Sequence, residues 1–214
     1  MEKIKLLHTL PMVFNGQTQV TSDVWHRELV FLRGECCLIE AASGTGKSSL
    51  CSYIYGSRDD YEGIICFDEQ NIRSLKMSDW VQLRNTSLSM LFQELRLFPE
   101  LTAWENVELK NRLTHFKTRR QVETYFDCLG IAEKLHVPVR KISFGQQQRV
   151  AFIRALCQPF DFILLDEPVS HLDEANAKAM AALLQEEVAR QGAGVLVTSI
   201  GKHIPMAYTK TLHL

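Results

Sequence analysis

Hydrophobic and polar residues fall into blocks along the chain, and these blocks predict strands alternating with helices. Short apolar runs are typical of buried strands, and they lie at 30–32, 35–40, 64–67, 88–92, 162–165 and 195–198. Amphipathic stretches predict helices, and they lie at 48–55, 80–84, 104–130 (including 119–129) and 173–190. Fully apolar strands separated by helices predict an α/β fold whose parallel sheet is covered on both faces.

Composition limits the possible classes of protein. A chain of 214 residues can bury the core of one domain, or of one domain with an inserted lobe. The formal net charge is −1 and no basic arm is present, so we expect no nucleic-acid partner. The apolar runs are too short to cross a bilayer, and the first residues do not resemble a signal peptide. Six cysteines without a Cys-x-x-Cys pair indicate reduced thiols and a cytosolic protein.

The strongest chemical signal is a loop between the strand at 36–40 and the helix at 48–55. Two glycines let successive backbone N–H groups point at an anion, and the helix adds its positive end. Lys47 is placed to reach the outer phosphates, and the Ser48 hydroxyl to bind Mg²⁺. The alternative is a surface turn rich in Gly and Ser. The predicted phosphate loop comprises Ala41, Ala42, Ser43, Gly44, Thr45, Gly46, Lys47, Ser48 and Ser49.

A second signal is the strand at 162–165, which is followed directly by Asp166 and Glu167. Carboxylates at the carboxyl end of a parallel strand face the ligand crevice of such sheets. We therefore expect Asp166 to support Mg²⁺ and Glu167 to polarise the water that attacks a terminal phosphate. The alternative is a pair of acids that caps a helix.

The segment 142–156, between these two signals, carries a family resemblance. Its residues Ser-Phe-Gly-Gln-Gln-Gln-Arg at 143–149 resemble the signature motif of the ATP-binding-cassette (ABC) ATPases, which usually begins Leu-Ser-Gly-Gly-Gln. Leu-Phe-Gln at 91–93 resembles the family's Q-loop, and Ser-His-Leu-Asp at 170–173 its D-loop. The run 97–107 and the triple glutamine are most similar to the lipoprotein-releasing, macrolide-export and cell-division cassettes. The resemblance extends over almost the whole chain.

This resemblance implies a P-loop NTPase core with N-terminal antiparallel strands and an inserted helical subdomain. The core would comprise 1–92 and 160–214, and the helical signature subdomain 93–159. Two cassettes would sandwich two ATP molecules with Mg²⁺. Lys47, Gln93 and Glu167 would be catalytic, and Ser48, Gln93 and Asp166 would hold the metal. The residues that complete the partner's nucleotide site, or couple the two sites, would be Ser143, Gly145, Gln146 and Asp173.

The resemblance also implies partners and a location. The chain would pair as a homodimer or with a different cassette, and would power a membrane permease that is a separate chain. The permease would contact a groove near Gln93 and 95–101, at the cytoplasmic face of the inner membrane. The alternatives are a soluble ABC-type ATPase and a slow, regulatory ATP-binding cassette. Neither the cargo nor the permease follows from the sequence.

The chain departs from the family pattern at three positions. Ala41 replaces the first loop glycine, which would cost about 1 kcal/mol if a positive φ were needed there. Phe144 replaces a signature glycine, and Ser199 stands where the family carries a switch histidine that contacts the γ-phosphate. We therefore predict slow basal hydrolysis with intact ATP binding, and a faster Ser199→His variant. His203 is a candidate substitute for that histidine, and Phe14 a candidate for stacking on adenine.

Overall fold

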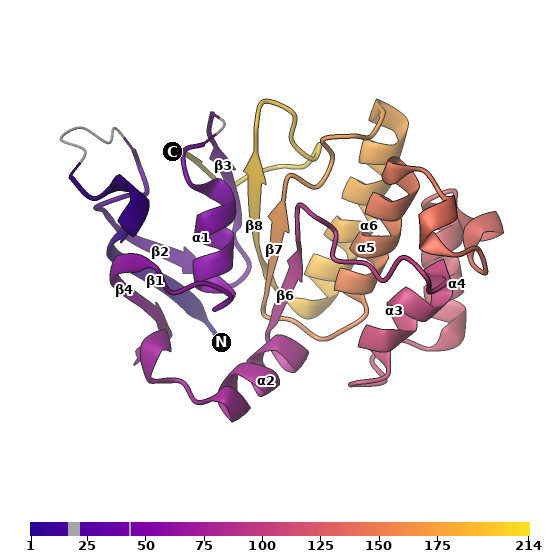
Figure 1. The fold of residues 1–214 in the computed structure, drawn as a ribbon, viewed down its shortest axis with the longest axis horizontal. Helices are drawn as coiled ribbons and strands as arrows, with labels where there is room; N and C mark the ends of the chain where they lie inside the picture. Colours follow the sequence, from indigo (N-terminus) through magenta and orange to yellow (C-terminus); the bar gives the residue numbers. More distant parts are fainter. Residues whose placement is uncertain (17–21, 43) are drawn as a thin grey trace.

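The computed structural model describes residues 1–16, 22–42 and 44–214, and it consists of two sheets flanked by helices (Figure 1). The strands are β1 (Lys3–Pro11), β2 (Glu28–Leu32), β3 (Cys36–Glu40), β4 (Tyr61–Phe67), β5 (Gln70–Asn71), β6 (Leu88–Leu91), β7 (Phe162–Asp166), β8 (Gly194–Ser199) and β9 (Lys210–His213). The helices are α1 (Lys47–Ile54), α2 (Met77–Thr86), α3 (Ala103–Asn111), α4 (Arg119–Cys128), α5 (Phe144–Leu156) and α6 (Glu174–Gln191). Short 3₁₀ turns lie at Met12–Phe14, Ile72–Ser74, Ala132–Lys134 and Val139–Lys141.

The larger sheet is parallel and has the strand order β6-β7-β8-β3-β9, whereas the order β2-β1-β4-β5 forms an antiparallel sheet. Every residue of β7 and β8 is buried. Ile163 and Leu165 pack into the core shared with α3 to α6, while Phe162 and Leu164 pack into the core shared with α1 and β1. Alternate residues thus fill two cores, which is why these strands are apolar throughout. The predicted fold class is confirmed.

The helical region differs from the sequence prediction, because 104–130 is not one amphipathic helix. It contains α3 and α4, separated by residues 112–118. The buried side chain of Asn111 accepts a hydrogen bond from Lys117 N (2.9 Å) and donates one to Lys117 O (2.9 Å), which closes a compact loop. Thr118 then caps α4 through a reciprocal pair of hydrogen bonds with Gln121. Local polar capping therefore overrides the continuous helical pattern.

The N-terminal strand β1 lies at a segment for which the apolar runs predicted no element. Its central residues alternate between buried Ile4 and Leu6 and partly exposed lysines, which is the pattern of a strand with one covered face. At the other side of the molecule in Figure 1, α3 and α4 lie beyond α5 and α6, away from the antiparallel sheet. In the described residues, no helix combines the length and the apolar character that a membrane span needs.

Candidate functional site

The predicted phosphate loop joins β3 to α1, and its glycines are in conformations that other residues rarely adopt. Gly44 has φ +84° and Gly46, the N-cap of α1, has φ +96°. Buried Trp25 holds the loop in place, because its Nε1 donates a hydrogen bond to Thr45 O (3.0 Å). The Thr45 hydroxyl in turn donates to Ala42 O (2.9 Å). Ser43 lies outside the described residues, so its predicted role stays a prediction.

Lys47 is the cation of this loop and its side chain is buried. Its Nζ donates a hydrogen bond to Ala42 O (2.8 Å), which holds the ammonium group against the loop backbone. Burial lowers the pKa of Lys47, and the negative charges of Glu167 and Asp166 oppose this shift. Lys47 therefore lies in the field of the two acids that end β7, as the sequence interpretation requires.

The acid pair occupies the end of β7 with one residue buried and one lining a cavity. Thr198 Oγ1 donates a hydrogen bond to Asp166 Oδ1 (2.5 Å), and burial raises the pKa of Asp166 while the Thr198 and Ser48 hydroxyls oppose that shift. Glu167 has φ +51°, a left-handed conformation uncommon for a residue other than glycine. Such strained conformations cluster at functional sites, where the surrounding structure holds them. Here Glu167 N donates to Thr198 O (3.1 Å), and Glu167 O accepts from Gln148 Nε2 (3.2 Å).

The three predicted metal ligands offer a hydroxyl, an amide oxygen and a carboxylate. Ser48 Oγ donates a hydrogen bond to Gln93 Oε1 (3.1 Å), which brings the start of α1 and the end of β6 together. Ser48 also lies close enough to Asp166 to affect its pKa. Oxygen donors of these kinds are those that Mg²⁺ binds, so the residues present fit this ion.

These elements surround a cavity of about 270 Å³, which we call the nucleotide pocket. Its lining residues are Val13, Phe14, Gly44, Gly46, Lys47, Ser48, Ser49, Gln93, Glu167 and Ile200. Phe14, considered for adenine stacking, lies over the loop, with its Cε2 3.2 Å from where a Cβ on Gly46 would be. Val13 and Ile200 were not predicted from the sequence, because an exposed aliphatic residue beside a turn carries no motif.

The predicted signature and D-loop residues do not line the nucleotide pocket of their own chain. Ser143 caps α5 by accepting a hydrogen bond from Gln146 N (3.3 Å). Asp173 caps α6 by accepting one from Asn176 N (2.8 Å). Gly145 lies against the D-loop, since a Cβ there would be 3.3 Å from His171 O. Their assignment to the site of a facing cassette stays a prediction.

Phe144, the replaced signature glycine, is the first residue of α5 and is exposed at the helix surface. Its ring meets the ring of His171 edge-on at 4.5 Å. The ring at this position therefore packs onto the D-loop of its own chain and leaves the cap formed by Ser143 in place.

Of the other departures, Ala41 causes no backbone strain, because it is not among the residues with positive φ. Its N–H donates to Ser199 O (3.1 Å). Ser199 is fully buried and its hydroxyl donates to Lys202 O (2.7 Å), so its side chain serves a turn and does not line the nucleotide pocket. The exposed side chain at the mouth of the pocket belongs to the next residue, Ile200. His203 lies 3.8 Å from Glu40 and packs on Tyr208, likewise away from the pocket lining.

Comparison with known proteins agrees with this geometry. The family model described as ABC transporter matches residues 20–170, which is more than half of the chain. The chain belongs to the ABC transporter family. The recognition made from the signature segment and the phosphate loop is thereby confirmed.

Three curated relatives of this ABC family member indicate its range of similarity. An uncharacterized ABC transporter ATP-binding protein of Mycobacterium tuberculosis is 32% identical, over 81% of this chain and 54% of the relative. The macrolide export ATP-binding/permease protein MacB of a Shewanella species is 32% identical, over 88% and 29% respectively. The lipoprotein-releasing system ATP-binding protein LolD of Shewanella denitrificans is 30% identical, over 86% and 78%. The chain thus spans about half of the first relative and less than a third of MacB.

A solved structure provides the comparison of folds. The ATP-binding cassette MJ0796, seen as a dimer in a post-hydrolysis state with ADP and Pi, superposes with a TM-score of 0.74 at 27% identity. The superposition covers 92% of this chain and 87% of that cassette. The family's cassette fold therefore extends over nearly the whole described chain.

Proposed function

We propose that this chain is the ATP-binding and ATP-hydrolysing subunit of an ABC transporter. The observation that carries the proposal is the nucleotide pocket, where Lys47, the Ser48–Gln93 pair and Glu167 meet at one end of the parallel sheet. Phosphoryl transfer to water needs a loop that binds the phosphates, oxygen ligands for a cation and a carboxylate that positions the water, and this pocket has all three.

In this proposal each side chain has one task. Lys47 neutralises charge on the outer phosphates, and the loop N–H groups with the positive end of α1 hold them. Ser48, Gln93 and Asp166 would hold Mg²⁺, which supplies charge neutralisation at the phosphate oxygens when bound. Glu167 orients the attacking water and accepts its proton. Positioning and electrostatics, rather than covalent chemistry by the protein, provide the rate.

The proposed assembly is a pair of cassettes on a separate membrane permease. Each cassette would present Ser143, Gly145 and Gln146 to the nucleotide of its partner, with the positive end of α5 aimed at it. The solved relative MJ0796 is dimeric, which supports the pairing of cassettes. MacB is named as an ATP-binding/permease protein, which supports the coupling of such a cassette to a permease, and LolD is named as an ATP-binding protein alone, which supports a permease on another chain. We infer that residues 93–159 form the helical lobe that meets the permease. The chain would then act at the cytoplasmic face of the inner membrane.

A second candidate is a slow, regulatory ATP-binding cassette. It is favoured by the buried Ser199, whose hydroxyl donates to Lys202 O, and by the lining of the pocket, where none of the described residues is a histidine. The two candidates differ in turnover rate and not in ATP binding, so kinetics of the purified chain distinguish them.

The test compares the wild type with Glu167→Gln in both activity and partners. We expect Mg²⁺-dependent ATP hydrolysis that falls by about 10²- to 10⁴-fold in Glu167→Gln, since a positioned base contributes that much. Exposed Glu186 on α6 provides the matched control, and Glu186→Gln should hydrolyse ATP at the wild-type rate. Nucleotide binding, measured by equilibrium titration, should persist in Glu167→Gln.

Tagged Glu167→Gln protein is then recovered from its native host with ATP and Mg²⁺ after mild solubilisation. Co-purification of a protein with several membrane spans would support the transporter subunit. Ribosomes, nucleic acid or soluble proteins alone would replace it with a soluble ABC-type ATPase. ATP binding without measurable wild-type hydrolysis would favour the regulatory cassette.

A further inference from the structure

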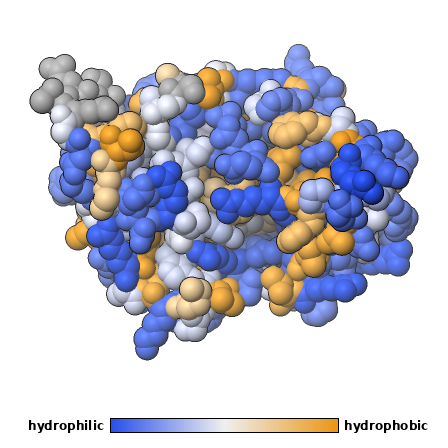
Figure 2. All heavy atoms as spheres, viewed as in Figure 1, coloured by the Kyte–Doolittle hydropathy of each residue, from blue (hydrophilic) through white to orange (hydrophobic). Residues whose placement is uncertain are grey.

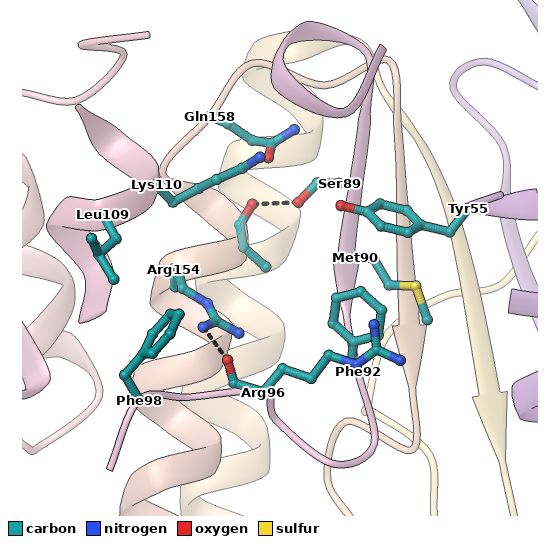
Figure 3. Close-up of a pocket in the computed structure, with 11 residues that line it drawn as sticks. Tyr55, Ser89, Met90, Phe92, Arg96, Phe98, Leu109, Lys110, Arg154 and Gln158 are labelled. Atoms are coloured by element: carbon teal, nitrogen blue, oxygen red, sulfur yellow. Dashed lines mark hydrogen bonds between the residues drawn. The ribbon is translucent and has the colours of Figure 1, made fainter. Parts of the chain in front are cut away.

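A second cavity of about 250 Å³ lies between the parallel sheet and α3, and we call it the basic pocket (Figure 3). Side chains from α3 and α5 form one wall, while Tyr55, Met90 and Phe92 form the other. The full lining is Tyr55, Ser89, Met90, Phe92, Arg96, Phe98, Leu109, Lys110, Arg154, Ala155 and Gln158. No residue of this lining belongs to the nucleotide pocket.

Two of the three cations of the basic pocket, Lys110 and Arg154, have backbone carbonyls as hydrogen-bond partners, whereas the third, Arg96, lies 4.0 Å from Glu94 (Nε to Oε2). Arg154 donates hydrogen bonds to Arg96 O (2.7 Å) and Leu95 O (2.5 Å), and Lys110 Nζ donates to Arg84 O (2.7 Å). Burial lowers the pKa of Lys110 to about 8, and the charges of Arg154 and Arg84 add to this shift. Burial lowers the pKa of Arg154 to about 10, a shift that Tyr55 opposes and Arg96 increases. Within the described residues that line the pocket, no side chain is acidic. A cation desolvated without a counter-charge favours an anionic ligand.

The rim of the basic pocket is apolar and exposed. Phe98 is 56% exposed and Leu109 is 47% exposed, and Leu113, which follows the end of α3, is exposed as well. Phe98 is fixed by buried Asn106, which accepts a hydrogen bond from Phe98 N (2.8 Å) and donates one to Phe98 O (3.0 Å). Figure 2 shows hydrophobic residues among polar ones on the side where α3 lies. Within 95–101, where the resemblance implies the permease contact, Leu95 is buried in the core.

The basic pocket is joined to the nucleotide pocket through one strand end. Phe92 lines the first and Gln93, the next residue, lines the second. The two residues whose carbonyls Arg154 holds, Leu95 and Arg96, both have left-handed backbones with φ +58° and +48°. Arg154 therefore connects the basic pocket to the strained segment that begins two residues after Gln93.

We propose that the basic pocket binds an Asp or Glu side chain, carried on an apolar segment of the membrane partner and seated between Lys110 and Arg154. This inference rests on the proposed function and adds the chemistry by which the partner is recognised. The cavity has room for a few side chains, and its aromatic wall and apolar rim suit a peptide flanked by hydrophobic residues. A nucleic-acid backbone would instead require an open row of exposed cations.

The test places a photo-reactive phenylalanine analogue at Leu109 in the full-length protein and irradiates membranes of the native host. We expect a cross-link to a loop of a multi-span protein, with an Asp or Glu in the cross-linked peptide. Lys110→Glu should lower the yield at least about tenfold, because a like charge would meet the carboxylate. Lys134→Glu, at a lysine outside this pocket, is the matched control and should leave the yield unchanged. Reversing the identified acid to Lys should restore the yield with Lys110→Glu.

Separate readouts keep this inference apart from the proposed function. ATP binding and basal hydrolysis of purified Lys110→Glu should equal those of the wild type, because Lys110 lies outside the nucleotide pocket. A cross-linked peptide without an acid, a yield unaffected by Lys110→Glu, or cross-links only to RNA or soluble proteins would overturn the carboxylate site. If Glu167→Gln recovers a membrane partner but the analogue at Leu109 gives no cross-link, the proposed function stands and the carboxylate site is overturned.

Discussion

The nucleotide pocket and the basic pocket are built in opposite ways. The first is centred on one loop, 44–49, which supplies five of its ten lining residues and whose backbone conformation creates the anion-binding surface. The second is assembled from side chains of β6, α3, α5 and the segment between β6 and α3, together with Tyr55 after α1 and Gln158 after α5. A site made of consecutive backbone groups leaves a local sequence motif, whereas one made of distant side chains leaves none. The structure is therefore needed for the second and only refines the first.

The two pockets also differ in their charge balance. In the nucleotide pocket, Lys47 lies in the field of Asp166 and Glu167, which offset part of the cost of burying it. In the basic pocket, the charges that act on Lys110 are Arg154 and Arg84, which add to that cost. The first pocket is thus electrostatically compensated within the chain, and the second is completed by a group that another molecule brings.

The largest effect is expected where the backbone of the nucleotide pocket is changed. Gly46→Ala puts a Cβ 3.0 Å from Trp25 and 3.2 Å from Phe14 in a left-handed conformation. Gly44→Ala is the matched control, with φ +84° and nothing within 4 Å of its Cβ. The control should lose about 1–2 kcal/mol of unfolding free energy from the conformation alone. Gly46→Ala should lose more, and weaken nucleotide binding, in denaturant titrations and equilibrium binding.

Equal losses in the two variants would contradict this account, because they would mean that the ring of Trp25 moves aside at no cost. The supporting contact would then contribute nothing to the shape of the loop.

Much of the core could be predicted because its signals are local. Four of the five strands of the parallel sheet, the loop before α1 and the acids at the end of β7 follow from runs of a few residues, whereas β9 was not predicted. The break between α3 and α4 was missed because it depends on Asn111 reaching Lys117, a side-chain contact that periodicity does not encode. The sequence interpretation placed Ser199 at the switch position, but the side chain that lines the nucleotide pocket is that of Ile200. The direction of these two consecutive side chains at the end of β8 decides which of them lines the pocket, and no sequence motif records that direction.

The next effect tests that one-residue shift. Ile200 is 47% exposed and lines the nucleotide pocket, whereas Ser199 is fully buried. Ile200→His should therefore raise the ATP hydrolysis rate, by about tenfold if the imidazole donates to the developing phosphate charge. Ser199→His should not, and should unfold at lower denaturant because an imidazole overfills its site. The original expectation of a faster Ser199→His variant is restored if the steady-state rates reverse this order.

The smallest expected effect is a pH dependence of the free energy of unfolding, which depends on the charge of Lys110 in the basic pocket. The folded-state pKa of Lys110 is about 8, below its usual 10.5, so the folded state releases this proton first. Between pH 8 and 10.5 the unfolded state therefore binds more protons at Lys110 than the folded state does. The contribution of Lys110 to the free energy of unfolding must then rise as the pH increases through this range. Urea unfolding at pH 7.5 and 10 should show the wild type gaining stability relative to Lys110→Met, with Lys134→Met as the control. A difference that does not change with pH would mean that Lys110 is already compensated in the free chain, which would remove the need for a partner's carboxylate.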